Sequence, residues 1–243
     1  MSAAPTKTRI TVRDLGRTDY RAAWDVQLQT HAAVAEGRVP PTLLLTEHPP
    51  VITFGKKGGR ANLLSDPARL EAQGFSLFDI ERGGDVTYHG PGQLVGYPIL
   101  PIGRAVRSYL RNLEAVMVQV LAEYGLTGVG SPGYAGVWVG DEKVVAIGVA
   151  IKRNVSFHGF AMNVSTDLTH FSHIVPCGIQ DRGVTSLSKL LDRPVTLDEV
   201  KPKLMRAFAD TFEVDISEVD ISASPIAASP TASLQPAESE VSV

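Results

Sequence analysis

The sequence predicts a single α/β domain (α+β) in which short strands and amphipathic helices share one hydrophobic core. Several apolar runs have the length and composition of strands. Two longer segments carry apolar residues at helical spacing. No long linker interrupts the first 215 of the 243 residues, and a chain of that length can bury one sizeable core. We therefore expect one domain over residues 1–216.

The first half of the chain alternates predicted strands and helices. Ile10 and Val12 alternate with polar residues, as in a half-buried strand. A helix is predicted over 20–36, capped by Asp19 and stopped by Gly37. Residues 43–46 and 51–54 predict two buried strands separated by a rigid corner, and they place 55–60 in an exposed loop. A short helix within 62–73, with Pro67 at its first position, and a strand over 75–81 complete this half.

The second half begins with a predicted strand over 94–99 and the most amphipathic helix of the chain over 108–124. Residues 136–139 and 143–151 predict a hairpin, because a Gly-Asp-Glu turn joins two apolar runs. Another strand is expected over 157–164. A last helix is predicted over 197–212, bent or delayed by Pro202. Residues 217–243 are rich in Ser, Ala, Pro and Glu, and we expect a disordered tail.

Composition limits the classes of function. The net charge of −3 argues against a dedicated nucleic-acid binder. Cys177 is the only cysteine, so an intramolecular disulfide is impossible and a reducing cytoplasm is expected. No apolar run approaches the roughly 20 residues that a membrane helix needs, and the first residues lack the apolar core of a secretion signal. We expect a monomer in the cytoplasm without a membrane partner.

Residues 82–93 are the most unusual segment of the chain. They contain four glycines and a proline, together with Arg82, Thr87, Tyr88, His89 and Gln93. Glycines permit positive φ and let the backbone approach a ligand closely, while residues 86–88 have the composition of a short strand. A tight hairpin is the alternative interpretation, but a plain turn does not need so many functional side chains. The segment therefore indicates a binding site.

This segment closely resembles the signature of lipoyl(octanoyl) transferases. The similarity runs over roughly residues 42–212 and includes four further blocks in the family's order: Gly136-Val137-Trp138-Val139, Lys143-Val144-Val145-Ala146-Ile147-Gly148, Phe157-His158-Gly159-Phe160-Ala161-Met162-Asn163-Val164 and Ile174-Val175-Pro176-Cys177-Gly178-Ile179. The chain departs from the family at Gly55-Lys56, where Gly-Arg is more usual. The positive charge is kept there, but a bidentate arginine contact is lost.

Cys177 and Lys143 are the candidate catalytic residues. A lone cysteine is more often an inert buried residue, but Cys177 lies between a proline and a glycine, and the resemblance favours a nucleophile. Lys143 begins an apolar strand, where desolvation would lower its pKa and suit it to proton transfer. A solvated turn lysine is the alternative, and the family pattern favours the functional role. Lys152 has the opposite strand parity, so both lysines cannot face one site.

The histidines allow other interpretations. His89 or His158 could pair with the cysteine as a base, and a structural role is as plausible for each. The resemblance favours the lysine as the base and places both histidines near the acyl pocket. No metal is expected: His170 and His173 have i, i+3 spacing, but His89, His158 and Cys177 are scattered among glycines without a paired-ligand pattern.

The resemblance implies a fold like that of biotin and lipoate protein ligases, with a mixed sheet and flanking helices. It implies transfer of an octanoyl group from octanoyl-acyl carrier protein to a lysine of lipoyl domains, through an acyl thioester on Cys177 and without ATP or another cofactor. The acceptors would be the E2 subunits of 2-oxoacid dehydrogenases and the glycine cleavage H protein. The expected substrate-binding residues are Arg82, Gly83, Gly84, Asp85, Val86, Thr87, Tyr88, His89, Ala146, Ile147, Gly148, Gly159, Phe160 and Ala161, with His158 as a further pocket residue.

Two other functions fit the same fold. An ATP-dependent lipoate or biotin ligase needs no cysteine, and an acyl-binding or carrier-binding module needs no catalytic residue at all. The presence of both Cys177 and Lys143 argues against each of them, which the fold by itself would not do.

Overall fold

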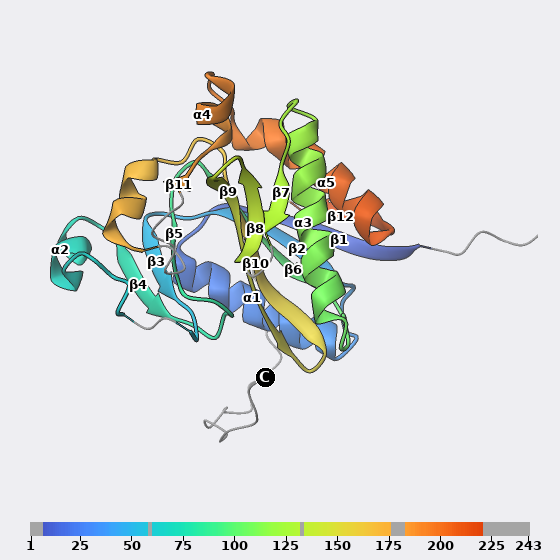
Figure 1. The fold of residues 1–243 in the computed structure, drawn as a ribbon. Helices are drawn as coiled ribbons and strands as arrows, with labels where there is room; N and C mark the ends of the chain where they lie inside the picture. Colours follow the sequence, from blue (N-terminus) through green and yellow to red (C-terminus); the bar gives the residue numbers. More distant parts are fainter. Residues whose placement is uncertain (1–6, 58–59, 132–133, 176–182, 221–243) are drawn as a thin grey trace, which may run out of the picture.

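A mixed sheet forms the centre of the molecule (Figure 1). The computed structural model describes residues 7–57, 60–131, 134–175 and 183–220. The strands of this sheet lie in the order β12 (Val214–Asp220), β1 (Thr8–Arg17), β2 (Thr42–Glu47), β6 (Gln93–Ile99), β10 (Val155–Asn163), β9 (Glu142–Lys152), β8 (Tyr134–Val139) and β7 (Val129–Ser131), with β11 (Gly183–Val184) beside β9. β1 is parallel to β12 and β2, whereas the pairs from β2 to β7 are antiparallel. The predicted mixed sheet is confirmed.

A second, three-stranded sheet lies beside the first and was not predicted. Its order is β4 (Ser76–Asp79), β3 (Val51–Phe54) and β5 (Val86–His89). The predicted corner at His48-Pro49-Pro50 is the point at which the chain leaves β2 in the large sheet and enters β3 in the small one. Proline has no N–H to continue a ladder, so the two strands cannot fuse into one.

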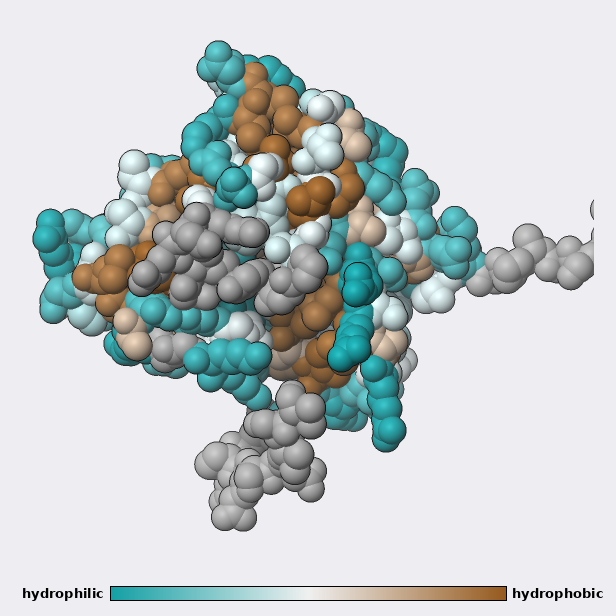
Figure 2. Space-filling view, viewed as in Figure 1, coloured by the Kyte–Doolittle hydropathy of each residue, from teal (hydrophilic) through white to brown (hydrophobic). Residues whose placement is uncertain are grey.

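Helices cover both faces of the large sheet. α3 (Val106–Ala122) and α5 (Leu197–Phe212) pack on one face and contact each other, while α1 (Tyr20–Ala35) lies on the opposite face (Figure 1). Successive side chains of a strand point to opposite faces of the sheet, so the hydrophobic core has one part on each face. Leu43 and Leu45 belong to the α3–α5 side, whereas Leu44 belongs to the α1 side. Figure 2 shows apolar surface beside α4 (Leu187–Leu191), whose Leu190 and Leu191 are partly buried against the α3–α5 side.

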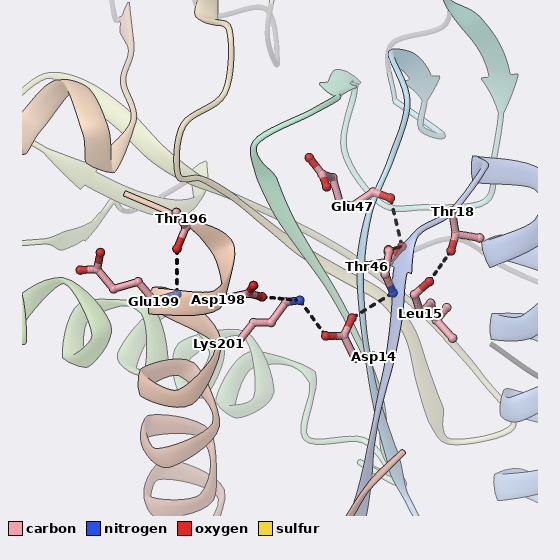
Figure 3. A network of polar contacts seen from close by, with 10 residues as sticks. Asp14, Leu15, Thr18, Thr46, Glu47, Thr196, Asp198, Glu199 and Lys201 are labelled. Atoms are coloured by element: carbon pink, nitrogen blue, oxygen red, sulfur yellow. Dashed lines mark hydrogen bonds and ion pairs between the residues drawn. The ribbon is translucent and has the colours of Figure 1, made fainter. Parts of the chain in front are cut away.

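A polar network fixes the start of α5 to the sheet (Figure 3). Thr196 caps the helix by accepting the Glu199 N–H at its hydroxyl. The Lys201 ammonium donates to Asp14 of β1 at 2.7 Å and to Asp198 at 3.3 Å. The helix runs through Pro202 without ending, with the bounds expected from the sequence. The predicted delay of its start is therefore wrong, because Pro202 lies inside a helix that tertiary contacts hold in place.

The remaining elements are short. α2 (Pro67–Ala72) begins after Asp66, whose carboxylate accepts the Arg69 N–H, as the position of Pro67 predicts. The 3₁₀-helix η1 (Leu168–His173) and α4 were not predicted. No helix among the described residues is long and apolar enough to cross a membrane.

The last described strand corrects the domain boundary. β12 pairs with β1 from Thr8↔Val214 to Arg13↔Asp220 and so extends beyond residue 216, where we expected the domain to end. Hydrogen bonding to β1 holds a segment that has too little apolar content to be recognised as a strand. The rest of the predicted tail, residues 221–243, lies outside the described residues.

Candidate active site

A cavity lies between the large sheet, the small sheet and α1. It encloses about 480 Å³ of empty space, including its open mouth. Its lining residues come from α1, β5, β6, β8, β9 and β10 and from the loop before β5. They are Tyr20, Arg82, Thr87, His89, Val95, Tyr97, Ala135, Ala146, Ile147, Gly148, His158, Gly159, Phe160 and Ala161.

Small residues on two paired strands make room for the cavity. Gly148 of β9 lies opposite Gly159 of β10, and Ala146 lies opposite Ala161. A side chain at Gly159 would collide with the Gly96 carbonyl oxygen. A Cβ at Gly148 would lie 2.7 Å from Arg82 Cδ. Gly159 thus allows β6 to lie close to β10, and Gly148 makes room for the Arg82 side chain.

The glycine-rich segment presents only alternate side chains to the cavity. Thr87 and His89 of β5 line it, whereas Val86 and Tyr88 belong to a separate apolar cluster with α2 and η1. The Tyr88 hydroxyl lies 2.7 Å from His170 Nδ1. The period of two in a strand accounts for this division.

Arg82 organises the loop that precedes β5. Its side chain is 8% exposed and donates to the carbonyls of Gly83 at 2.9 Å and Asp85 at 2.6 Å. Asp85 accepts from Asn62 and from the Val86 N–H, and Gly84 has a φ of 91°. Arg82 lines the cavity, whereas Gly83, Gly84 and Asp85 do not. Burial also removes Arg82 from the solvent-exposed surface.

His89 is buried and neutral near physiological pH. Its Nδ1 lies 2.7 Å from Gln93 Oε1, and its ring stacks on Tyr20 with centroids 6.2 Å apart. Burial lowers the pKa of His89 to about 3. His48, next to it, bridges the Thr18 carbonyl and the Tyr97 hydroxyl, and burial lowers the pKa of His48 to about 4. Both imidazoles are therefore neutral hydrogen-bonding groups rather than cations.

His158 lies on β10 at the far side of the cavity. It has a φ of 54°, is 1% exposed, and donates its backbone N–H to Gln27 of α1. Its Nε2 lies 3.8 Å from a Glu81 carboxylate oxygen, beyond hydrogen-bond distance. Burial lowers the pKa of His158, although the nearby carboxylate acts in the opposite direction.

Lys143 is buried at the start of β9. Only 7% of it is exposed, and its Nζ lies 4.6 Å from the centroid of the Trp138 ring. An aromatic face attracts a cation by its quadrupole, and a desolvated pair of this kind is worth about 2 kcal/mol. The alternative of a solvated turn lysine is wrong. Lys152, at the other end of β9, is exposed.

Lys143 lines a second cavity next to the first. Thr87, Ala146 and Ala161 line both spaces, and Lys143, Gln93 and Asn163 line the second one only. Gln93 Nε2 donates to Asn163 Oδ1 at 2.9 Å, which places its Oε1 next to His89. A connected polar wall thus runs from His89 toward Lys143.

Cys177 lies outside the described residues. The described residues on each side of 176–182 lie beside Lys143: Phe171 lines the Lys143 cavity, and Val184 of β11 pairs with Lys143. The Thr185 N–H also donates to the Lys143 carbonyl at 2.9 Å.

Four lining residues were not predicted: Tyr20, Val95, Tyr97 and Ala135. They come from elements whose sequence reads as ordinary helix or strand, so only the packing of α1, β6 and β8 brings them to the cavity. Among the described residues, no group of three His, Cys, Asp or Glu side chains is placed to hold a metal ion.

The family model of the lipoyl protein ligase A/B catalytic domain matches residues 19–209 of the chain. An octanoyltransferase from Solibacter usitatus is 48% identical over 208 residues, which cover 84% of this chain and 94% of the relative. An octanoyltransferase from Alkaliphilus metalliredigens is 46% identical over 211 residues, with 85% and 97% covered.

The fold is similar to that of solved lipoate protein ligases. A lipoate-protein ligase A bound with ATP superposes with a TM-score of 0.73 at 20% identity, covering 89% of this chain and 90% of the other. A bipartite lipoate protein ligase from Thermoplasma acidophilum gives 0.70 at 19% identity, with 89% and 88% covered. The predicted ligase-like α/β fold is confirmed.

Proposed function

The chain belongs to the lipoyl protein ligase A/B catalytic family and is an acyltransferase of the octanoyltransferase type, and we propose that it moves an octanoyl group from octanoyl-acyl carrier protein to a specific lysine of lipoyl domains. The acceptors would be the E2 subunits of 2-oxoacid dehydrogenases and the glycine cleavage H protein. The proposal includes a monomeric enzyme in the cytoplasm.

One observation carries this proposal: the buried Lys143 lines a cavity that shares Thr87, Ala146 and Ala161 with a neighbouring cavity, which small and apolar side chains line in part. An acyl chain can lie along Ala146, Gly148 and their partners on β10 while its carbonyl carbon remains beside the lysine. Residues of β9, β10 and β6 indicate the same direction for the acyl chain. Lys143, Asn163 and Gln93 mark the reacting end, and Gly148, Gly159 and Tyr97 lie further along the same strands.

In the first half-reaction, the Cys177 thiolate attacks the carbonyl carbon of the carrier's thioester. A new carbon–sulfur bond forms, and the carrier's sulfur leaves and takes a proton. Lys143 is the proposed proton acceptor for the Cys177 thiol and donor to the leaving thiolate. Its burial beside Trp138 supports this role, because a lysine away from water gives up its proton more readily.

In the second half-reaction, the amine of the target lysine attacks the acyl thioester on Cys177. An amide bond forms, the Cys177 thiolate leaves, and Lys143 receives the proton that the amine loses. Conversion of a thioester to an amide runs downhill, so the reaction needs no ATP and no other cofactor. The protein supplies the nucleophile, proton handling and donors for the oxyanion.

The test is intact-protein mass spectrometry after incubation with octanoyl-acyl carrier protein. We expect one octanoyl adduct, lost on addition of a lipoyl domain and not formed by Cys177→Ala. If the alanine variant still modified the lipoyl domain and required ATP to do so, the protein would be a ligase. If neither form accepted the acyl group while octanoate still bound, it would be a binding module.

A further inference from the structure

A buried amide side chain joins two parts of the chain beside Lys143. Asn163 is the last residue of β10, is 5% exposed, and lines the Lys143 cavity. Its Nδ2 donates to the Thr185 carbonyl at 3.0 Å, and its Oδ1 accepts from Gln93 Nε2 at 2.9 Å. Thr185 directly follows β11 and is fully buried. Asn163 thus connects the end of the glycine-rich segment to the end of β11.

The orientation of this amide is fixed by its partners. A carbonyl oxygen can only accept a hydrogen bond, so the Thr185 carbonyl selects the nitrogen of Asn163. The oxygen of Asn163 then faces Gln93, whose nitrogen donates to it and to the Tyr88 carbonyl at 3.2 Å. The Gln93 oxygen is left to accept from His89 Nδ1. Rotation of the Asn163 amide by half a turn would break both of its bonds.

β11 is too short to hold its own place against the sheet. It is two residues long and pairs with β9 at two positions, one of which is Val184↔Lys143. The Thr185 N–H continues this pairing by donating to the Lys143 carbonyl at 2.9 Å. Small isolated strand pairs are marginally stable in water. The bond from Asn163 to the other side of the Thr185 peptide therefore helps to keep β11 against β9.

The position of β11 bears on the proposed chemistry of Lys143. Val184 lines the Lys143 cavity together with Asn163. β11 is also the first described element after residues 176–182, which include Cys177. A misplacement of about 1 Å in a reacting group can lower a rate about 10²-fold. A bond that fixes β11 beside Lys143 can therefore have a large effect on the reaction.

We propose that Asn163 is a positioning residue for Lys143. Its amide holds β11 beside the lysine, so that the amine and the Cys177 thiol exchange a proton in a constant geometry. Asn163 acts through the Thr185 carbonyl and not by contact with the acyl group. This inference rests on the proposed transfer reaction and adds a residue that the reaction scheme does not yet use.

The test uses two variants that lose the bond to Thr185. Asn163→Leu is uncharged and of similar size, whereas Asn163→Asp still accepts from Gln93 but cannot donate to Thr185. We expect both to slow single-turnover acylation by octanoyl-acyl carrier protein about 10²-fold, with the half-saturating carrier concentration changed less than about threefold. A loss in Asn163→Asp alone would be an effect of its charge and would overturn the inference, as would a loss confined to carrier affinity.

Combination with Lys143→Ala shows whether Asn163 acts through the lysine. If it does, adding Asn163→Leu to Lys143→Ala should slow acylation by no more than a further factor of about three, because residues that act as a unit are not additive. A further loss of about 10²-fold would mean that Asn163 contributes independently of Lys143, and the inference would be wrong.

Ser156→Ala is the matched control for general loosening of β10. Ser156 lies near the other end of this strand, is fully buried, and donates from its Oγ to the Pro98 carbonyl at 2.8 Å. It lines neither the acyl cavity nor the Lys143 cavity. Its replacement removes a buried bond to a carbonyl and should lower stability, but acylation should keep the wild-type rate.

Two measurements do not need acyl transfer. Exchange of the Thr185 amide hydrogen should become about fivefold faster in Asn163→Leu, the factor that one typical intramolecular hydrogen bond provides. Cys177 is the only cysteine, so alkylation by iodoacetamide reports its ionisation alone. The midpoint of alkylation against pH should rise in Asn163→Leu toward about 8.5, the value of an unassisted thiol.

These measurements separate the inference from the proposed function. If the wild type formed no octanoyl adduct, the proposed function would fail, and faster exchange with a higher alkylation midpoint in Asn163→Leu would still support Asn163 as a positioning residue. Unchanged exchange and an unchanged midpoint would overturn the inference, and so would wild-type acylation in spite of faster exchange. Asn163→Ala takes the place of Asn163→Leu if the leucine variant does not fold, as judged by circular dichroism.

Discussion

The ammonium group of Lys143 lies against the Trp138 ring, on the buried face of a strand whose other end carries the exposed Lys152. The two lysines therefore have different chemistry on the same element. The burial of Lys143 beside an aromatic ring is the environment in which we propose that it accepts and donates protons, and Lys152 does not share this environment.

Replacement of Lys143 by alanine should slow formation of the acyl adduct about 10²- to 10⁴-fold at neutral pH, since a positioned base contributes that much. The rate should recover in part as pH rises through about 8.5, where an unassisted thiol ionises. Lys143→Arg should not restore the rate, because guanidinium cannot act as a base there. Single-turnover acylation measured against pH distinguishes these outcomes, with Lys152→Met as the matched control.

His48 and His89 should make the fold sensitive to acid. Both have lowered pKa values, about 4 and about 3, so in the folded protein they stay neutral while the unfolded chain binds protons below about pH 6.5. Stability should thus be complete above pH 6.5 and fall as the pH drops toward 4. Each histidine accounts for about 2 kcal/mol near pH 5. Urea unfolding at several pH values measures the slope.

His89→Gln provides the control for this acid sensitivity. It keeps a polar side chain beside Gln93 but cannot titrate, so the variant should lose the part of the pH dependence between 6.5 and 4 that His89 contributes, while His48 and the buried His158 keep theirs. An identical slope in the variant and the wild type would show that His89 is already protonated in the folded state, contrary to its burial.

The sequence predicted most of the residues that line the cavity, but it did not separate them from neighbours on the same strands that point elsewhere. Ala146, Gly148, Gly159 and Ala161 were expected and do line it, whereas Tyr88 lies in a separate core. The family-like blocks mark continuous stretches, and only the register of the strands decides which alternate residues face the cavity.

At the scale of elements, the strongly periodic segments were predicted well. α3 and α5 occur close to where the spacing of apolar residues predicted helices. A helix that buries one face carries apolar residues at helical spacing, and this pattern is visible in the sequence. β7, β11, α4 and η1 are each only two to six residues long, too short for a period to be visible. β7 and β11 form because β8 and β9 supply their hydrogen bonds, whereas α4 and η1 are capped by the side chains of Ser186 and Asp167.

The attachment of α5 to β1 through Lys201 should contribute to stability. Both Lys201 and Asp14 are less than one-fifth exposed, and Lys201→Met would leave the Asp14 carboxylate partly buried without its main partner. We expect a loss of about 1–3 kcal/mol in the free energy of unfolding, measured in urea. Lys203→Met is the matched control and should change it by less than about 0.5 kcal/mol, because Arg206 also holds the Glu123 partner of Lys203.

At the scale of the whole molecule, the last described strand, β12, completes the large sheet. β12 is an edge strand of the large sheet and covers β1 along six paired positions. We expected the domain to end at 216 because the composition changes to Ser, Ala, Pro and Glu from residue 217 on. Without β12, the hydrogen-bonding edge of β1 would face solvent and promote association.

Two truncations test the role of β12. Ending the chain after Glu213 should lower the melting temperature by at least about 5 °C and increase aggregation, because the edge of β1 loses its partner. Ending it after Asp220 should change the melting temperature by less than about 2 °C, as the composition of 221–243 offers little apolar surface for packing. If the chain that ends after Asp220 also showed a large drop in melting temperature, the tail would have to pack on the domain.

The distribution of charge over the molecule gives the last prediction, which concerns the proposed carrier protein. Carrier proteins of this class are acidic, and a slightly acidic enzyme needs a local positive surface to attract one. Of the four cations that the sequence places in and beside the loop 55–60, Arg82 is buried and Arg60 forms an ion pair with Asp79. Lys56 and Lys57 remain exposed, and their N–H groups bond to the Arg82 and Gly84 carbonyls beside the cavity.

Reversal of both charges, Lys56→Glu with Lys57→Glu, should raise KM for the acyl carrier protein several-fold at low salt and flatten its dependence on ionic strength. The lysines attract the carrier through a field that salt screens over about 10 Å at 0.1 M, so their effect must fade as salt is added. Arg107→Glu with Arg111→Glu changes the net charge equally on exposed positions of α3, an element that packs on the large sheet rather than on β3. If the α3 variant lost as much as the loop variant, only the net charge would matter. If the loop variant kept the wild-type salt response, the carrier would have to approach from another side of the cavity mouth.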